Sequence, residues 1–216
     1  MIHTLAITKD SKLEKDLPLE KLNDTNIKWF WVDFDCPTTK ESELLHTHFH
    51  FHKLAIEDCL HNLQRAKLDY YEGYSFFVLH SLNEKTLSPE EADMFMSEKF
   101  IVSFHNTHLS EFDEVWEKIS TPESALNEGS IYIGYHILDE IVDHYFPAVY
   151  NLENLIDGIG DSLSKDSMDK VFEIRSDLLK LRRIVNQMRD LIYRVLNSTH
   201  LEEVKNNRDR KSTRLN

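Results

Sequence analysis

Residues 52–82 read HKLAIEDCLHNLQRAKLDYYEGYSFFVLHSL and carry the strongest signal for the fold. Its first part surrounds the acidic pair Glu57-Asp58 with apolar side chains, which predicts one or two helical turns. Residues 64–67 are a polar connector, and residues 74–82 are an aromatic and branched run typical of a buried strand. The stretch therefore predicts a helix, a connector and a strand in direct succession.

The composition limits both the size and the class of the protein. The chain has 216 residues, of which 41% are hydrophobic and 11% aromatic, so we expect a folded protein with one or two domains. The net charge of −13 disfavours nucleic acid, whose phosphates require Lys and Arg, and favours cations. Two cysteines make no disulfide framework and favour a reducing, cytoplasmic setting. No stretch approaches the roughly 18 apolar residues of a membrane span, so we expect a soluble chain.

Residues 1–129 predict an α+β domain, a mixed sheet flanked by helices. We expect strands at residues 28–35, at 74–82 and as a pair within 92–104, an edge strand at 3–8, and a turn at 89–91. We expect helices from Lys40, capped by Thr38 or Thr39, and over residues 110–119, capped by Ser110.

From Ser130 the apolar spacing becomes helical and predicts a long antiparallel hairpin over residues 130–204. Steps of four and three indicate a first long helix, which Pro147 should kink. After a turn near residues 164–169, strict heptad spacing indicates a coiled-coil seam in a second helix. The seam consists of Val171, Ile174, Leu178, Leu181, Val185, Met188, Ile192 and Val195. Some 33 residues give a rod of about 50 Å, so we expect the hairpin to project from the domain.

These segments together resemble the cytoplasmic domain of the CorA-like magnesium and cobalt transporters. The resemblance rests on residues 52–82, on YHILDEIVDHYFPAVYNLENLID (135–157) and on IRSDLLKLRRIVNQMRDLIYRVLN (174–197), and runs from about Trp29 to Val204. Lys53 and Ala66 stand where the family pattern has proline. In the family a third long helix follows and enters the membrane. Residues 209–216 do not align with that helix, and residues 205–216 are interpreted as a truncated or foreign tail.

The resemblance implies metal ligands at Glu57, Asp58 and Asp139, because family carboxylates at matching positions take part in divalent-ion sites between subunits. The implied ion is a regulatory Mg²⁺, which prefers a few carboxylates and keeps several waters. A further family ligand lies on the third helix. Judged without the resemblance, these carboxylates are solvated or capping groups. Asp139 and its neighbours Glu140 and Asp143 can equally form ion pairs with Arg175, Arg182 or Arg183.

Four histidines at alternate positions, His46, His48, His50 and His52, form a second candidate group. On a strand they would share one face and could hold Zn²⁺; on the predicted helix only His46 and His50 are neighbours, which favours adventitious binding. Because the same superfamily has a zinc-transporting branch, Zn²⁺ remains an alternative ion, and the family also implies Co²⁺. No glycine-rich phosphate loop or nucleophile elbow is present, so we expect no enzyme.

The sequence therefore predicts the ion-sensing, regulatory domain of a CorA-like magnesium or cobalt transporter, on the cytoplasmic side of the membrane. The family implies a homo-oligomer, a pentamer in full-length members, that reaches the membrane only through its C-terminal part. Two alternatives stay open: a zinc transporter domain of the same superfamily, and a soluble interaction module without an ion role.

Overall fold

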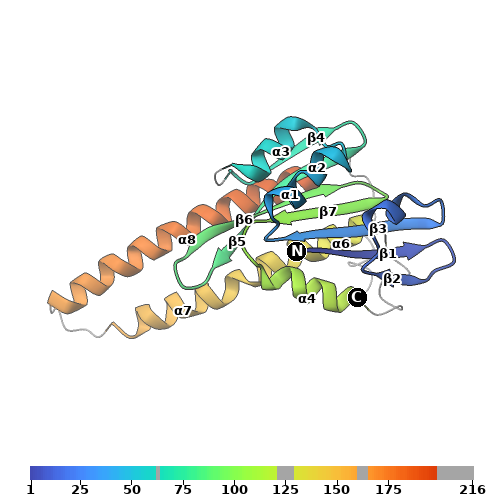
Figure 1. Ribbon diagram of the computed structural model, residues 1–216. Coiled ribbons are helices and arrows are strands. Elements are labelled where there is room, and N and C mark those ends of the chain that lie inside the picture. The colour runs from blue at the N-terminus through green and yellow to red at the C-terminus, as the bar shows by residue number, and fades with distance from the viewer. Residues whose placement is uncertain (62–63, 121–128, 160–164, 199–216) are drawn as a thin grey trace.

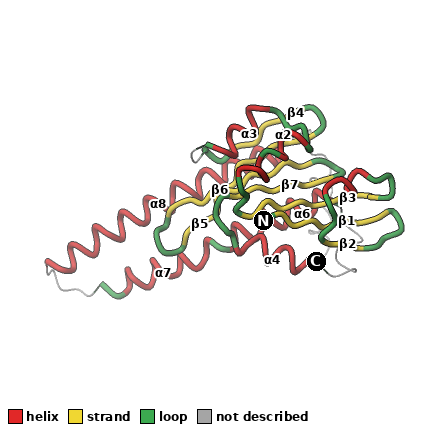
Figure 2. Tube along the Cα trace, in the orientation of Figure 1, coloured by secondary structure: helices red, strands yellow, loops and turns green. Residues whose placement is uncertain are grey.

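The structure, a computed structural model, describes residues 1–61, 64–120, 129–159 and 165–198. Within these ranges one mixed sheet has the strand order β2-β1-β3-β7-β6-β5-β4. Its strands are β1 (Ile2–Thr8), β2 (Leu13–Lys15), β3 (Ile27–Asp35), β4 (Lys67–Tyr71), β5 (Tyr74–Asn83), β6 (Ser88–Met96) and β7 (Phe100–His105). The helices are the 3-10 turn η1 (Leu19–Asn23), α1 (Thr39–Ser42), α2 (Leu44–Thr47), α3 (Lys53–Leu60), α4 (Ser110–Ile119), α6 (Ser130–Asp143), α7 (Tyr145–Asp157) and α8 (Lys165–Asn197). Figures 1 and 2 show helices flanking the sheet, so the predicted α+β fold is confirmed.

The sheet is antiparallel except between β3 and β7. The expectation that residues 3–8 form an edge strand is wrong, because β2 pairs with the outer side of β1. The predicted turn at residues 89–91 is also wrong, since these residues belong to β6 and the chain reverses just before them. Proline is tolerated there because β7 pairs only with residues 93–96 of β6, which leaves Pro89 with a strand on one side alone.

One face of the sheet is covered by α1, α2 and α3. Thr38 caps α1 as predicted, in a reciprocal bond with Glu41. Phe51, between α2 and α3, is 3% exposed and stacks on Phe95 of β6 with ring centroids 3.9 Å apart. The buried residues of this layer form a core that is separate from the one on the opposite face.

The opposite face is covered by α4, α6 and α8. At Gly134, α6 approaches the sheet so closely that a Cβ atom would lie 2.6 Å from the sulfur of Met96. Ser110 is the first residue of α4, but Leu109 occupies the N-cap position and no side-chain capping bond forms, so the predicted Ser110 cap is wrong. The two layers thus hold α3 and α6 on opposite faces of the sheet.

The predicted long helix from Ser130 is divided at His144 into α6 and α7. Pro147 lies in the first turn of α7 and has no N–H to donate to the carbonyl of residue 143, so the predicted kink is confirmed. The second helix, α8, has 33 residues and runs antiparallel beside α7, extending well beyond the sheet (Figure 1). It begins at Lys165, within the segment predicted as a turn.

The two sets of heptad positions in the predicted seam of α8 differ in burial. Ile174, Leu181, Met188 and Val195 are buried, whereas Val171, Leu178 and Val185 are 40%, 42% and 37% exposed. Half of the predicted seam is therefore buried, and α8 buries Ile184 and Leu191 in addition because it contacts β4, β5 and β6 as well as α7.

Candidate cation sites

Helix α3 presents the acidic pair to solvent. The ring nitrogen of His52 accepts the N–H of Leu54 at 3.2 Å and caps the helix, while Ala55 and Cys59 are buried against the sheet. Glu57 is therefore exposed, and the side chain of Asp58 is 20% exposed. The predicted helix is confirmed, with Glu57 on its exposed side and Asp58 at the boundary of the core.

Lys67 of β4 is the ion-pair partner of Asp58. Its ammonium group lies 2.7 Å from Asp58 and 3.0 Å from Asp69. Burial alone would lower the pKa of Lys67, but hydrogen bonds and charge from these two carboxylates raise it. Lys67 was predicted to lie in a connector, and its sequence neighbours gave no signal for this pair. An ion that binds Asp58 must therefore compete with an ammonium group already in place.

Two further carboxylates lie behind α3 on β6. Burial raises the pKa of Glu91 to about 7 and raises that of Asp93 well above its ordinary value. The backbone N–H of Gln64 donates to Glu91. Burial, with Asp93 nearby, also raises the pKa of the Cys59 thiol. Asp93 interrupts an apolar run of strand character, and that interruption was the one sequence signal for this group.

Replacing Glu91 with Gln is expected to remove part of the pH dependence of stability. The folded protein raises the pKa of Glu91 from 4.5 to about 7 and so binds this proton more tightly than the unfolded chain. The free energy of unfolding of the parent therefore falls as pH rises from about 4.5 to above 7. Urea unfolding at pH 5 and pH 8, in EDTA, should show the Gln variant gaining stability relative to the parent. Glu72→Gln, in the exposed β4–β5 turn, should keep the parent's slope, and equal slopes for all three proteins would contradict the prediction.

Asp139 lies on α6 and is exposed. Because α3 and α6 cover opposite faces of the sheet, Asp139 and the pair Glu57-Asp58 are not brought together in one chain. Among the described residues, no group of three potential ligands contains any of them. The alternative ion pairs with arginines of α8 are not formed by Glu140, which pairs with Lys118 of α4 instead. A site shared by α3 and α6 thus requires two chains.

The four alternate histidines serve separate local contacts. The ring of His50 contacts the carbonyl of His46 at 3.1 Å, as expected for neighbours four residues apart. His48 packs edge-on against Phe49, and His52 caps α3 and stacks on Tyr71. In the described part of the chain these histidines belong to no group of three potential metal ligands. The geometry therefore favours structural contacts over a shared zinc site.

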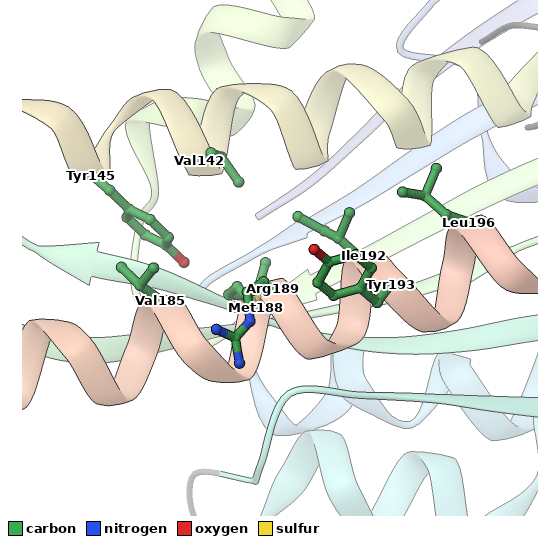
Figure 3. A pocket seen from close by; sticks show the side chains of 8 residues that line it. All are labelled: Val142, Tyr145, Val185, Met188, Arg189, Ile192, Tyr193 and Leu196. Carbon is green, nitrogen blue, oxygen red and sulfur yellow. The ribbon is translucent and has the colours of Figure 1, made fainter.

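A groove of about 340 Å³ lies between α6 and α7 on one side and α8 on the other. Figure 3 shows Val142 and Tyr145 facing a row of α8 side chains that includes Val185, Ile192 and Leu196. Its lining is apolar or aromatic apart from Arg189, which suits a helix or another apolar segment and not a cation.

Comparisons with known proteins first define the class of the fold. The structure matches the soluble domain of CorA from Methanocaldococcus jannaschii with a TM-score of 0.75 and 17% identity, over 93% of this chain and 80% of that chain. It also matches the ZntB cytoplasmic domain from Vibrio parahaemolyticus with a TM-score of 0.67 and 9% identity, over 91% and 78% of the two chains. The sheet and helices therefore have the fold of the CorA soluble domain.

Sequence comparison then identifies the family. The family model described as CorA-like Mg²⁺ transporter protein matches residues 26–215, and the chain belongs to this family. The putative metal ion transporter YfjQ of Bacillus subtilis is 44% identical over 207 residues, which are 94% of this chain and 65% of that protein. The chain thus spans just under two thirds of the length of this relative. In the described residues, no helix combines the length and the apolar character that crossing a membrane requires.

Proposed function

We propose that this chain is the ion-sensing, regulatory domain of a divalent metal ion transporter, with Mg²⁺ as the principal ion and Co²⁺ as an alternative. The observation that supports it most strongly is membership of the CorA-like family across residues 26–215. In this proposal Glu57 and Asp58 of one subunit and Asp139 of another bind regulatory Mg²⁺. Loss of the ion leaves their negative charges unbalanced and loosens the assembly.

The placement of the carboxylates supports a site between subunits. Glu57 and Asp58 project from one face of the molecule and Asp139 from the other, so a ring of identical chains can bring one face against the next. The ion-free state is defined by Lys67, whose ammonium group neutralises the charge of Asp58 when no ion is bound. Mg²⁺ must displace Lys67 from Asp58 in order to bind, and this competition lowers the affinity for Mg²⁺ and keeps binding reversible.

The exposed side of α8 supports a larger assembly. Val171, Leu178 and Val185 recur every seven residues and form an exposed apolar stripe on α8, of which Val185 also lines the groove of Figure 3. We propose that the third long helix implied by the family covers this stripe and leads to the membrane part of a homo-oligomeric transporter. The chain would then lie on the cytoplasmic side of the membrane.

Adding Mg²⁺ is expected to raise the melting temperature of the 216-residue chain. For a dissociation constant of about 1 mM, 10 mM Mg²⁺ adds about 1.4 kcal/mol of stability. That gain corresponds to about 3–6 °C in a domain of this size. Asp58→Asn and Asp139→Asn should each abolish the rise, whereas Glu153→Gln, an exposed position on α7, should keep it. Sedimentation velocity should show association on adding Mg²⁺.

A chain with neither a thermal shift nor association in Mg²⁺ would favour the rival function, an interaction module without an ion role. The zinc alternative is supported by the fold of the ZntB cytoplasmic domain alone. It predicts that Zn²⁺ stabilises the chain through His46 and His50, so unchanged zinc affinity in the double alanine variant would remove it.

A further inference from the structure

Two carboxylates and an imidazole converge where α4 meets the junction of α6 and α7. Glu114 comes from α4, Glu140 from the last turn of α6, and His144 from the break between the two helices. One ligand atom from each lies within 4.8 Å of the others. Glu140 and His144 are four residues apart and share a helix face, while Glu114 reaches them from a helix packed alongside.

The distances fit a single small cation. The Nε2 atom of His144 lies 3.1 Å from Glu114 Oε1 and 3.9 Å from Glu140 Oε1. Tetrahedral ligands with metal bonds of about 2.1 Å are separated by about 3.4 Å, which falls between these two values. The side chain of Glu114 is 46% exposed and can rotate away from Nε2 to reach that spacing, and a small rotation of the Glu140 side chain would shorten the longer distance.

An independent feature lies on the other side of the imidazole. The Nδ1 atom of His144 faces Glu111, whose Oε1 is 4.0 Å away and whose side chain is 5% exposed. Metal-bound histidines commonly direct their second ring nitrogen to a carboxylate, which fixes the ring and its tautomer. Glu111 also accepts the hydroxyl of Ser81 and is thereby anchored in the core. A buried carboxylate thus lies on the side of the ring where it would orient the imidazole, leaving Nε2 directed at the two glutamates.

The charge of the cluster also favours a divalent ion. Glu111, Glu114 and Glu140 contribute three carboxylates, and Lys118 pairs with Glu140 through a side chain that is 54% exposed. These groups retain an excess of two negative charges when His144 is neutral. An arriving ion can displace Lys118, because that side chain already reaches solvent.

We propose that Glu114, Glu140 and His144 form a second divalent-metal site, selective for transition-metal ions such as Co²⁺ or Zn²⁺ over Mg²⁺. The imidazole provides the selectivity, since Mg²⁺ prefers an all-oxygen shell whereas Co²⁺ and Zn²⁺ bind nitrogen readily. All three ligands belong to one chain, so the site forms without subunit assembly. It joins α4 to the α6–α7 junction and shares no ligand with the proposed Mg²⁺ site.

Cobalt absorption spectroscopy tests the proposal on the 216-residue chain. The chain has 12 histidines, and His46 and His50 neighbour each other. His46→Gln and His50→Gln are therefore introduced into every protein, so that Co²⁺ binding to this pair does not contribute to the signal. Titration with Co²⁺ should give one saturable visible band that Zn²⁺ displaces and millimolar Mg²⁺ does not. Glu114→Gln and His144→Gln should each raise the half-saturating Co²⁺ concentration at least tenfold. Glu117→Gln, one turn further along α4 and exposed, should leave it unchanged.

A fourth variant separates metal binding from a purely structural cluster. Lys118→Met removes the cation that competes for Glu140 and should lower the half-saturating Co²⁺ concentration several-fold. Melting temperatures in EDTA verify that each variant is folded. If the His144 variant does not fold, the Glu114 variant still tests the site, because the Glu114 side chain is half exposed. Absence of saturable binding in the parent would overturn the proposal, as would equal affinities for the Glu114 and Glu117 variants.

Discussion

Replacing Phe51 with Ala is expected to destabilise the protein by about 3–5 kcal/mol, the range for removing a fully buried aromatic ring. The ring is 3% exposed and lies nearly parallel to Phe95. It also contacts Tyr74, with ring centroids 5.0 Å apart, and Phe49, at 5.4 Å. Truncation to Ala therefore leaves a cavity under the layer of helices that the ring anchors.

The effect should extend to the proposed ligands, because Phe51 immediately precedes the cap of α3. The N–H of His52 donates to the hydroxyl of Tyr74 at 2.8 Å, and Tyr74 packs on the same ring. Urea unfolding at pH 7 measures the loss, with Phe172→Ala as the control. Phe172 is 58% exposed on α8, and its removal should change stability by less than about 0.5 kcal/mol. Similar losses in the two variants would contradict the packing seen around Phe51.

Replacing His105 with Phe is expected to cost about 3–5 kcal/mol at pH 6, the range for removing one partner of a buried ion pair. His105 is 1% exposed, with Nε2 3.3 Å from Asp33 and Nδ1 2.7 Å from the carbonyl of Thr107. Nδ1 must donate to that carbonyl, so only a protonated ring can also present N–H to the carboxylate. Phenylalanine fills the space but leaves Asp33, which is 6% exposed, without its cation.

The cost of this substitution should depend on pH. Burial alone would lower the pKa of His105, but the carboxylate of Asp33, the carbonyl of Thr107 and Asp35 together raise it. A histidine whose pKa is raised on folding stabilises fully below its unfolded value of about 6.5. That contribution is lost as pH rises through the folded pKa. The difference between parent and variant should therefore be largest near pH 6 and shrink toward pH 9.

A double-mutant cycle with Asp33→Asn supplies the control. Once the charge of Asp33 is removed, His105→Phe should cost less than it does in the parent, and the difference is the coupling energy of the pair. Additive effects at pH 6 would show that the two side chains are not coupled and that the loss is one of packing alone.

Local sequence patterns were sufficient to identify most of the regular structure. Residues 28–35 and 74–82 form strands, and Glu57-Asp58 lies on a short helix, because apolar spacing and β-branched content act over a few neighbouring residues. Short strands escaped detection: β2 has 3 residues and β4 has 5, too few for a periodic signal. Pro89 was misinterpreted because its tolerance depends on which strand lies beside it.

The candidate sites depended more strongly on long-range contacts. The sequence alone was enough to show which carboxylates are present, that Glu57 and Asp58 are adjacent on a helix, and that the long helices carry apolar stripes. Three facts emerged only from the folded chain: Lys67 pairs with Asp58, Asp139 lies across the sheet from them, and Glu114 contacts His144. The physical reason is that helix and strand periodicity arise from neighbouring residues, whereas ion pairs and ligand groups depend on which elements the sheet order and helix packing bring together.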